Sequence, residues 1–340
     1  MGTAITNILT IKEINISHLS NKVLVVDGQN MLYQFLTSIR QQDGSLLTDS
    51  KGQVTSHLIG LIARVTNFMS KKLKLVFVFD GTVPELKHKE LQKRKQNKIH
   101  AEKKYQEAKS AENIEEMKKF ASRTTRLTKE MVEEAKLLLN AIGIPVIQAP
   151  SEGEAQAAHM VAKGDAYAIV SQDADSLLFG ATKVVRNLNV SGRRKYGSTY
   201  KSISPEIIDL SENLNNLGID RNQLIILSML VGTDYNIRGI KGIGPKKALK
   251  LVKEIKDKEK LFEEVKWDEN FEISWEKVYE TLNTVPVTDD YVIEWKNFDK
   301  EKITELLVKK HDFSEDRVNG LFEKLEKAQA DNSQKSIFEY

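Results

Sequence analysis

Two stretches decide the fold: residues 22–27, which read KVLVVD, and residues 73–80, which read LKLVFVFD. Each is a short, β-branched apolar run that ends on an aspartate, and such runs are typical of buried strands in a parallel sheet. Around them, strand and helix patterns alternate up to about residue 188. Helical patterns cover residues 30–39, 58–69 and 129–141, with a further helix from Gly153, and strand patterns cover residues 145–148 and 167–171. The alternation predicts an α/β fold with a central, mostly parallel sheet and flanking helices.

The chain divides into three expected regions. An α/β core is predicted at residues 1–204, with a lysine-rich insertion at about residues 82–128. Beyond it the apolar spacing is helical, so we expect a helical region at residues 205–327 that is continuous with the core. Residues 328–340 are small and polar, which is typical of a flexible tail.

Composition narrows the classes of protein. The 340 residues are 40% hydrophobic and 29% charged, with a formal net charge of +3, so affinity for nucleic acid would have to come from local basic patches. There is no cysteine, which excludes disulfides, thiolate metal sites and cysteine nucleophiles. No apolar stretch approaches the length of a membrane span, so we expect a cytoplasmic protein without a membrane partner.

Seven carboxylates lie at the ends of strands or the starts of helices. In an open α/β sheet, ligands bind in the crevice outside the carboxyl ends of the strands. Acids gathered there raise one another's pKa and require cations to stay ionised, and hard divalent ions prefer oxygen ligands. The sequence therefore predicts a metal site formed by Asp27, Asp80, Glu152, Glu154, Asp173, Asp175 and Asp234.

Most of these acids also have an ordinary structural interpretation. Ser151-x-x-Glu154 matches a capping box, and Glu152 would suit the dipole of the same helix. Turn formation or N-capping is the alternative for Asp173, Asp175 and Asp234. The two aspartates that end the strands have no obvious capping role. The occurrence of all seven acids at the ends of strands or the starts of helices favours the metal site.

The insertion after Asp80 is strongly basic near its start. Residues 87–104 carry eight basic side chains against two acids, an excess of six positive charges. A solvated helix face is the simple interpretation. A basic helical arch over an acidic, metal-binding crevice instead indicates a polyanionic substrate whose phosphates the arch would hold, with Lys93 among the contacts.

A second motif, GIKGIGPKKA at residues 239–248, predicts a phosphate-binding helix start. Spaced glycines allow close approach of the backbone, and proline suits the first helical turn. The exposed N–H groups, with two lysines behind them, can hold a DNA backbone without reading its sequence. This is a helix-hairpin-helix pattern, expected at about residues 225–256, with DNA contacts from Gly239, Gly242, Gly244, Lys246 and Lys247.

Three further side chains are candidates for DNA contact. Tyr33 follows Asp27 on the helix that leaves the site, where it could stack on an unpaired base, although core packing explains it equally simply. Arg40 and Arg64 fall at the two neighbouring helices, where surface salt bridges are the alternative.

The motifs VFDG, APSEGEAQAA, SQDADSLLFG, LVGTDY, RGIKGIGPKKAL and FSEDRV together resemble those of the flap endonucleases, structure-specific 5′ nucleases of DNA replication and repair. The resemblance covers about residues 21–327. It implies that the seven carboxylates hold two Mg²⁺ ions, for which Mn²⁺ can substitute. It further implies that Lys87 and Arg94 contact the scissile phosphate, that Tyr33 packs on the displaced nucleotide, and that a K⁺ ion assists the hairpin.

The same resemblance extends to the two ends of the chain. It implies that Gly2, once Met1 is removed, helps to seat the substrate. Gln334, Ile337 and Tyr340 fit the spacing of a peptide that binds the sliding clamp, PCNA, although one of its two usual adjacent aromatics is missing. The absence of a long basic tail after this peptide makes the chain look archaeal. We also expect a monomeric protein that associates with the nucleoid.

The expected function is therefore cleavage of 5′ flaps, with 5′–3′ exonuclease activity, by two-metal hydrolysis of a phosphodiester. Two alternatives are weaker. A phosphatase of the haloacid dehalogenase type would use Asp173-x-Asp175 after a strand, but leaves the hairpin and the arch without a role. A catalytically silent junction-binding scaffold would require broken carboxylates, whereas all seven positions are intact.

Overall fold

The computed structural model describes residues 4–111, 113–188, 193–196 and 199–333. Its centre is a seven-stranded sheet with the strand order β1-β9-β6-β5-β2-β3-β4. The strands are β1 (Lys12–Glu13), β2 (Val23–Asp27), β3 (Lys74–Phe79), β4 (Val146–Gln148), β5 (Ala168–Val170), β6 (Lys183–Arg186) and β9 (Glu206–Asp209), and a separate hairpin is formed by β7 (Arg193–Tyr196) and β8 (Thr199–Ser202).

The sheet is parallel in its middle and antiparallel at one edge. Strand β2 pairs in parallel with β3 and β5, and parallel pairing continues from β3 to β4 and from β5 to β6. Strand β9 pairs antiparallel with both β6 and β1. The mostly parallel α/β sheet predicted from the sequence is confirmed, and the antiparallel edge is a feature that its periodicity did not indicate.

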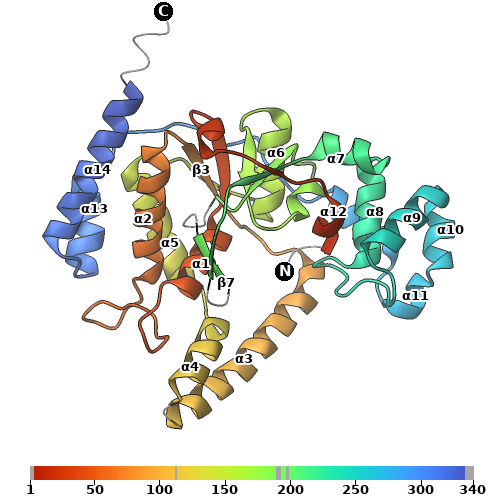
Figure 1. Cartoon of the computed structure of the whole chain (residues 1–340), viewed down its shortest axis with the longest axis horizontal. Coiled ribbons are helices and arrows are strands. Elements are labelled where there is room, and N and C mark those ends of the chain that lie inside the picture. Colours follow the sequence, from red (N-terminus) through yellow and green to blue (C-terminus); the bar gives the residue numbers. More distant parts are fainter. Residues whose placement is uncertain (1–3, 112, 189–192, 197–198, 334–340) are drawn as a thin grey trace, which may run out of the picture.

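Helices cover both faces of the sheet and extend beyond it (Figure 1). They are α1 (Gly28–Ser38), α2 (Ser56–Ser70), α3 (His88–Ser110), α4 (Ile114–Ala121), α5 (Lys129–Ile142), α6 (Gly153–Lys163), α7 (Leu210–Leu217), α8 (Arg221–Val231), α9 (Pro245–Glu254), α10 (Lys258–Glu264), α11 (Trp267–Asn270), α12 (Trp275–Asn283), α13 (Lys300–Thr304) and α14 (Glu315–Ser333). Shorter turns are η1 (Ala4–Ile8), η2 (Ile16–Leu19), η3 (Glu85–Lys87), η4 (Ser122–Thr124), η5 (Asp175–Leu177) and the π-helical η6 (Glu305–Lys310).

Alternation along the two central strands produces two hydrophobic cores. Val25, Val76 and Val78 face one core, which they share with α6 and the helices from α7 to α12. Leu24 and Phe77 face the other core, with α1, α2, α5 and α14. Because successive side chains of a strand point to opposite faces, the continuous apolar runs that predicted buried strands supply both layers at once.

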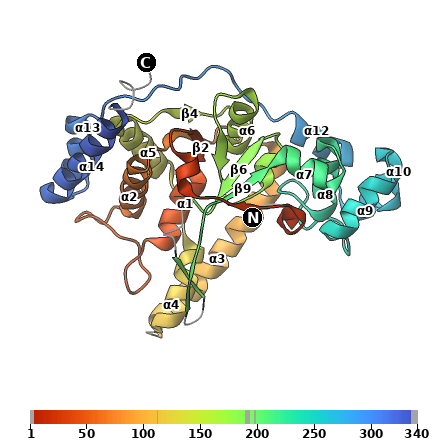
Figure 2. The same cartoon turned by 45° about the horizontal axis from the view of Figure 1, so that its top comes forward.

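The C-terminal part of the chain crosses the molecule. After α12 an extended segment runs over the top of the sheet to α13 and α14 on the opposite side (Figures 1 and 2). There His311 joins the loop between α1 and α2 to α5, with its Nδ1 3.0 Å from Asp49 Oδ2 and its Nε2 3.1 Å from Glu134 Oε1. Helix α14 continues to Ser333, beyond the expected start of a flexible tail at residue 328, because Ala328 is buried.

The insertion expected at residues 82–128 contains α3 and α4, which project away from the sheet as two packed helices (Figure 1). We call these two helices the arch. Helix α3 has almost no apolar face, so it is held by α4 and by polar contacts at its base. No helix in the described ranges is long and apolar enough to cross a membrane.

Candidate active site

The aspartates at the ends of β2 and β3 both bind a backbone N–H group. Asp27 Oδ1 accepts from the N–H of Asn30 at 2.9 Å and so caps α1. Asp80 Oδ1 accepts from the N–H of Gly153 at 2.7 Å, at the start of α6. A Cβ on residue 153 would lie 2.8 Å from this oxygen, which explains the glycine. The expectation that these two acids have no capping role is wrong, since Oδ1 of each accepts from an N–H group at the start of a helix.

The capping box at the start of α6 does not form. Ser151 Oγ donates to the carbonyl of Thr82 at 3.1 Å instead of capping the helix, and Glu152 occupies the N-cap position without a side-chain cap bond. Glu154 Oε1 accepts from Ser171 Oγ at 3.2 Å. The capping box is therefore wrong, whereas the position of Glu152 at the start of α6 still suits the helix dipole.

The acids that follow β5 also do not act as caps. Asp173 donates its N–H to Ser171 Oγ at 3.2 Å. Asp175 begins η5, and the residue before it, Ala174, provides no side-chain cap. The charges of Asp173 and Asp175 both raise the pKa of Glu154, which shows that the two side chains lie near it.

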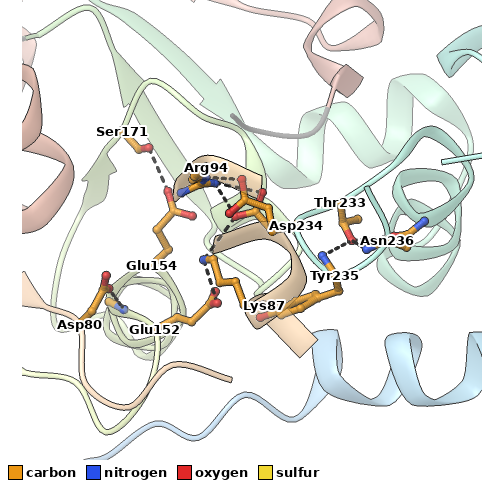
Figure 3. A network of polar contacts seen from close by, with 12 residues as sticks. Asp80, Lys87, Arg94, Glu152, Glu154, Ser171, Thr233, Asp234, Tyr235 and Asn236 are labelled. Carbon is orange, nitrogen blue, oxygen red and sulfur yellow. Dashed lines mark hydrogen bonds and ion pairs between the residues drawn. The ribbon is translucent and has the colours of Figure 1, made fainter. Parts of the chain in front are cut away.

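Asp234 comes from a different region, the rigid turn that follows α8. Thr233 Oγ1 donates to Asn236 Oδ1 at 2.7 Å, and Asn236 Nδ2 donates to the carbonyl of Met229 at 2.6 Å. The turn starts at Gly232, whose φ is +115° and where a Cβ would lie 2.6 Å from the N of Gly239. This packing brings Asp234 across to the acids of the sheet (Figure 3).

Electrostatic coupling joins these acids into one cluster. Burial, followed by the charge of Asp80, raises the pKa of Asp27 to about 7. Burial, followed by the charges of Asp175, Asp27 and Asp173, raises the pKa of Glu154 well above its ordinary value. Such crowding of like charges indicates a site that needs additional positive charge.

Two cations of the arch base enter the cluster (Figure 3). Lys87 Nζ lies 2.9 Å from Glu152 Oε1 and 3.3 Å from Asp234 Oδ2. Burial alone would lower the pKa of Lys87, but Glu152 and Asp234 outweigh it and raise that pKa. Arg94 reaches Asp234 Oδ2 with its Nη2 at 3.2 Å. Both residues that the resemblance singled out are thus brought to the seven acids.

Two residues of this site were missed by the sequence analysis. Glu90 is 3% exposed and pairs with Arg94 Nε, four residues further along α3. Their i, i+4 spacing was visible and could have suggested the pair. Tyr235 is 7% exposed, and its phenol ring extends toward Glu152 (Figure 3). Its only sequence signal was its place next to Asp234.

The donor set fits divalent metal ions in its chemistry. All seven side chains are carboxylates, and hard ions such as Mg²⁺ prefer oxygen ligands. Within the described ranges no three carboxylate or imidazole groups converge closely enough to hold an ion in their present positions. Lys87 and Arg94 supply part of the positive charge that these acids require.

The candidate DNA contacts lie along the arch and the helices beside it. Tyr33 is half-buried, with Lys98 Nζ of α3 5.2 Å from its ring centre, and burial raises the pKa of its phenol. Arg40 donates to the carbonyl of Gly44 at 2.8 Å and to Thr125 Oγ1 at 2.5 Å. Through these bonds Arg40 joins the loop after α1 to the segment that follows η4, where the chain leaves the arch.

Arg64 and Lys93 have fewer fixed contacts. Arg64 lies over the ring of Phe68 at 5.8 Å, and burial lowers the pKa of its guanidinium. The surface salt bridge offered as an alternative is absent for both Arg40 and Arg64 in the part of the chain that the structure describes. Lys93 is half-buried on α3, directly before Arg94.

The glycine-rich hairpin forms between α8 and α9. Gly239 and Gly242 have positive φ values of +59° and +80°, and Gly244 caps α9 with Pro245 in the first turn. Lys246 and Lys247 are exposed on that turn. The glycines, the proline and the two lysines thus lie together at the start of α9. Four candidate residues, Gly2, Gln334, Ile337 and Tyr340, lie outside the described residues.

A cluster of buried acids joined by two cations at the base of a lysine-rich arch is the arrangement expected of a nuclease, and comparison with known proteins agrees with that class. The model of the XPG N-terminal domain matches residues 2–101, and the model of the XPG I-region matches residues 143–234. The chain is 51% identical to flap endonuclease 1 of Thermofilum pendens, over 93% of this chain and 92% of that protein. It is 50% identical to flap endonuclease 1 of Hyperthermus butylicus, over 96% of this chain and 95% of that one.

Among solved structures, flap endonuclease-1 from Methanococcus jannaschii superposes with a TM-score of 0.76 at 39% identity, covering 97% of this chain and 100% of that one. The chain belongs to the flap endonuclease 1 family. The family resemblance inferred from the motifs is confirmed.

Proposed function

We propose that this protein is a structure-specific 5′ flap endonuclease with 5′–3′ exonuclease activity, acting in lagging-strand maturation and repair of DNA. The observation that carries the proposal is the convergence of Lys87 and Arg94, from the base of the arch, on Glu152 and Asp234 in the acidic crevice. A site that contains both carboxylates and cations can hold metal ions and a phosphodiester together.

The seven carboxylates would hold two Mg²⁺ ions, or Mn²⁺ in their place, with Asp234 acting mainly by orienting its neighbours. Held by these residues, the metal would supply the positive charge that activates a water molecule and stabilises the leaving oxygen. Lys87 and Arg94 would exchange their carboxylate partners for the oxygens of the scissile phosphate, where they would stabilise the developing negative charge. No histidine is needed as a base.

Selection of the substrate would depend on the geometry of the DNA path. Tyr33 would stack on the unpaired nucleotide, while Lys93 and Arg64 would contact phosphates. Arg40 would keep its bonds to Gly44 and Thr125 and thereby shape the path beside the arch. Unpairing a terminal nucleotide costs a few kcal/mol, which these contacts can offset.

Duplex DNA would be held at the hairpin between α8 and α9. The exposed N–H groups at the start of α9, with Lys246 and Lys247, suit phosphates, and backbone carbonyls of the hairpin suit a K⁺ ion. The tail would bind the sliding clamp, PCNA, through Gln334, Ile337 and Tyr340. The protein would act as a monomer in the cytoplasm, at the nucleoid, with Gly2 near the substrate.

The test is cleavage of a DNA double flap in Mg²⁺ by the wild type and by Asp173→Ala, with products mapped to the nucleotide. We expect cutting near the 5′ flap junction, its loss in Asp173→Ala, and unchanged DNA binding by that variant. Asp299→Ala is the control, because Asp299 caps α13 on the opposite side of the molecule.

The remaining outcomes identify the alternatives. Junction binding by the wild type without any cutting would favour the scaffold and overturn the proposal. Indifference to DNA, together with hydrolysis of a small phosphomonoester, would favour the phosphatase.

A further inference from the structure

Tyr235 carries a buried hydroxyl group without a hydrogen-bond partner. Its side chain is 7% exposed, and among the described residues its phenol oxygen makes no hydrogen bond of ordinary length. Buried polar groups in native proteins are nearly always hydrogen-bonded, because an unsatisfied donor forfeits its bond to water. Such an exception inside a proposed active site requires an explanation.

The position of this ring is set by the turn that carries Asp234. The N–H of Tyr235 donates to Thr233 Oγ1 at 3.2 Å, and the same hydroxyl of Thr233 is held by Asn236. The N–H of Ile240 donates to the carbonyl of Leu230 at 2.8 Å, which closes the segment behind the turn. With its backbone held in this way, the ring of Tyr235 is directed at Glu152 (Figure 3).

Glu152 is the carboxylate that the phenol faces. It is 8% exposed, and its Oε1 is paired with Lys87 at 2.9 Å. A tyrosine phenol has an ordinary pKa of about 10, so it keeps its proton at neutral pH and can act as a donor to this carboxylate. In the DNA-free protein, therefore, Lys87 is paired with Glu152, and the phenol of Tyr235 faces this carboxylate without a hydrogen bond of ordinary length to it.

Binding of substrate would change that arrangement. In the proposed function Lys87 transfers to the phosphate, so Glu152 loses the N–H donor that holds its Oε1, even though this carboxylate would also face a metal ion. A buried carboxylate that loses such a donor is free to reorient unless another donor replaces it.

We propose that Tyr235 is a positioning residue of this site: its hydroxyl donates to Glu152 when Lys87 moves to the phosphate, and so keeps that carboxylate in its orientation. This inference rests on the proposed function, because it requires Lys87 to contact the substrate. It assigns the unpartnered hydroxyl a role in the reaction and none in the stability of the free protein.

The first test is Tyr235→Phe, which removes only the hydroxyl. We expect the single-turnover rate on a 5′ flap to fall about ten- to a hundredfold, the range for loss of a hydrogen bond to a charged group. The affinity for flap DNA, measured without divalent ions, should stay within about twofold. Tyr291→Phe is the matched control, because the hydroxyl of Tyr291 donates to Asp165 at 2.5 Å, next to α6. It should leave the rate unchanged.

The second test uses thermal unfolding and needs no activity. Tyr235→Phe should leave the midpoint unchanged or raise it, since the hydroxyl has no partner to lose. In a Lys87→Met background, where Glu152 lacks its cation, the phenol would already donate to Glu152. There Tyr235→Phe should lower the midpoint by a few degrees.

An unchanged cleavage rate in Tyr235→Phe would overturn the inference. If Tyr235→Phe lowers the temperature of the unfolding midpoint equally in the wild type and in Lys87→Met, the inference is also overturned, because the hydroxyl is then purely structural. If the wild type does not cut flap DNA, the proposed function fails, whereas the unfolding comparison still reports whether Tyr235 and Glu152 are coupled.

Discussion

Asp27→Asn should stabilise the protein when no divalent ion is present. In the folded chain Asp27 lies among like charges, and burial together with Asp80 raises the pKa of its carboxyl from 3.8 to about 7. Asparagine has nearly the same shape and caps helices as well as aspartate does, so the bond from the N–H of Asn30 is kept. The substitution therefore removes a crowded charge and little else.

The expected gain follows from the difference between the two pKa values. A difference of about three pH units, at about 1.4 kcal/mol per unit, gives roughly 4 kcal/mol as an upper value. Asp80 and Glu154 share the same repulsion, so we expect a measured gain of about 2–4 kcal/mol. Because the folded state holds this proton more tightly than the unfolded state, wild-type stability falls as the pH rises from about 4 to about 7. The gain from Asp27→Asn should grow over the same interval and be complete at pH 8.

The assay is guanidinium chloride unfolding in a chelator at pH 4.5 and pH 8, repeated with excess Mg²⁺. Mg²⁺ should stabilise the wild type more than Asp27→Asn and so narrow the gap, because the variant lacks one proposed ligand. Asp257→Asn is the control, since Asp257 caps α10 in the same way, through the N–H of Lys260. If Asp27→Asn is no more stable than the wild type at pH 8 in chelator, the electrostatic account of this site is incorrect.

Two further predictions concern the DNA path and the turn that carries Asp234. Lys93→Ala should weaken binding of flap DNA and reduce the slope of log affinity against log salt by about 1, measured by fluorescence anisotropy, whereas Lys300→Ala, on α13, should leave the slope unchanged. Gly232→Ala should lower the free energy of unfolding by at least about 2 kcal/mol, because it combines a φ of +115° with a Cβ 2.6 Å from the N of Gly239. Gly242→Ala has a similar φ of +80° but meets nothing within 4 Å, so a loss as large as that of Gly232→Ala would contradict the steric argument.

The sequence analysis was accurate where the signal is local. The apolar runs before Asp27 and Asp80 predicted β2 and β3, because burial on both faces of a sheet demands continuous apolar residues. The glycines and proline between α8 and α9 predicted the hairpin, because positive φ values and a helix start require those residue types.

It was less accurate where one side chain has two possible partners. Ser151 and Glu154 match a capping box, yet the hydroxyl of Ser151 binds Thr82 from the neighbouring segment. Asp27 and Asp80 were predicted to have no capping role, yet both accept from N–H groups at helix starts. The spacing of residues shows which local bonds are possible, but competition from distant segments decides which of them form.

The sequence by itself therefore determined the kinds of element, the acids at their ends and the family to which the chain belongs. Only the tertiary structure decided which of the groups in the site pair with one another. It pairs Lys87 with Glu152, 65 residues away, and Arg94 with Asp234, 140 residues away. Among the residues that the structure describes, it also leaves the buried hydroxyl of Tyr235 without a hydrogen-bond partner. The physical reason is that such contacts depend on how strands and helices pack against one another. Local propensity and periodicity describe single elements and do not determine that packing.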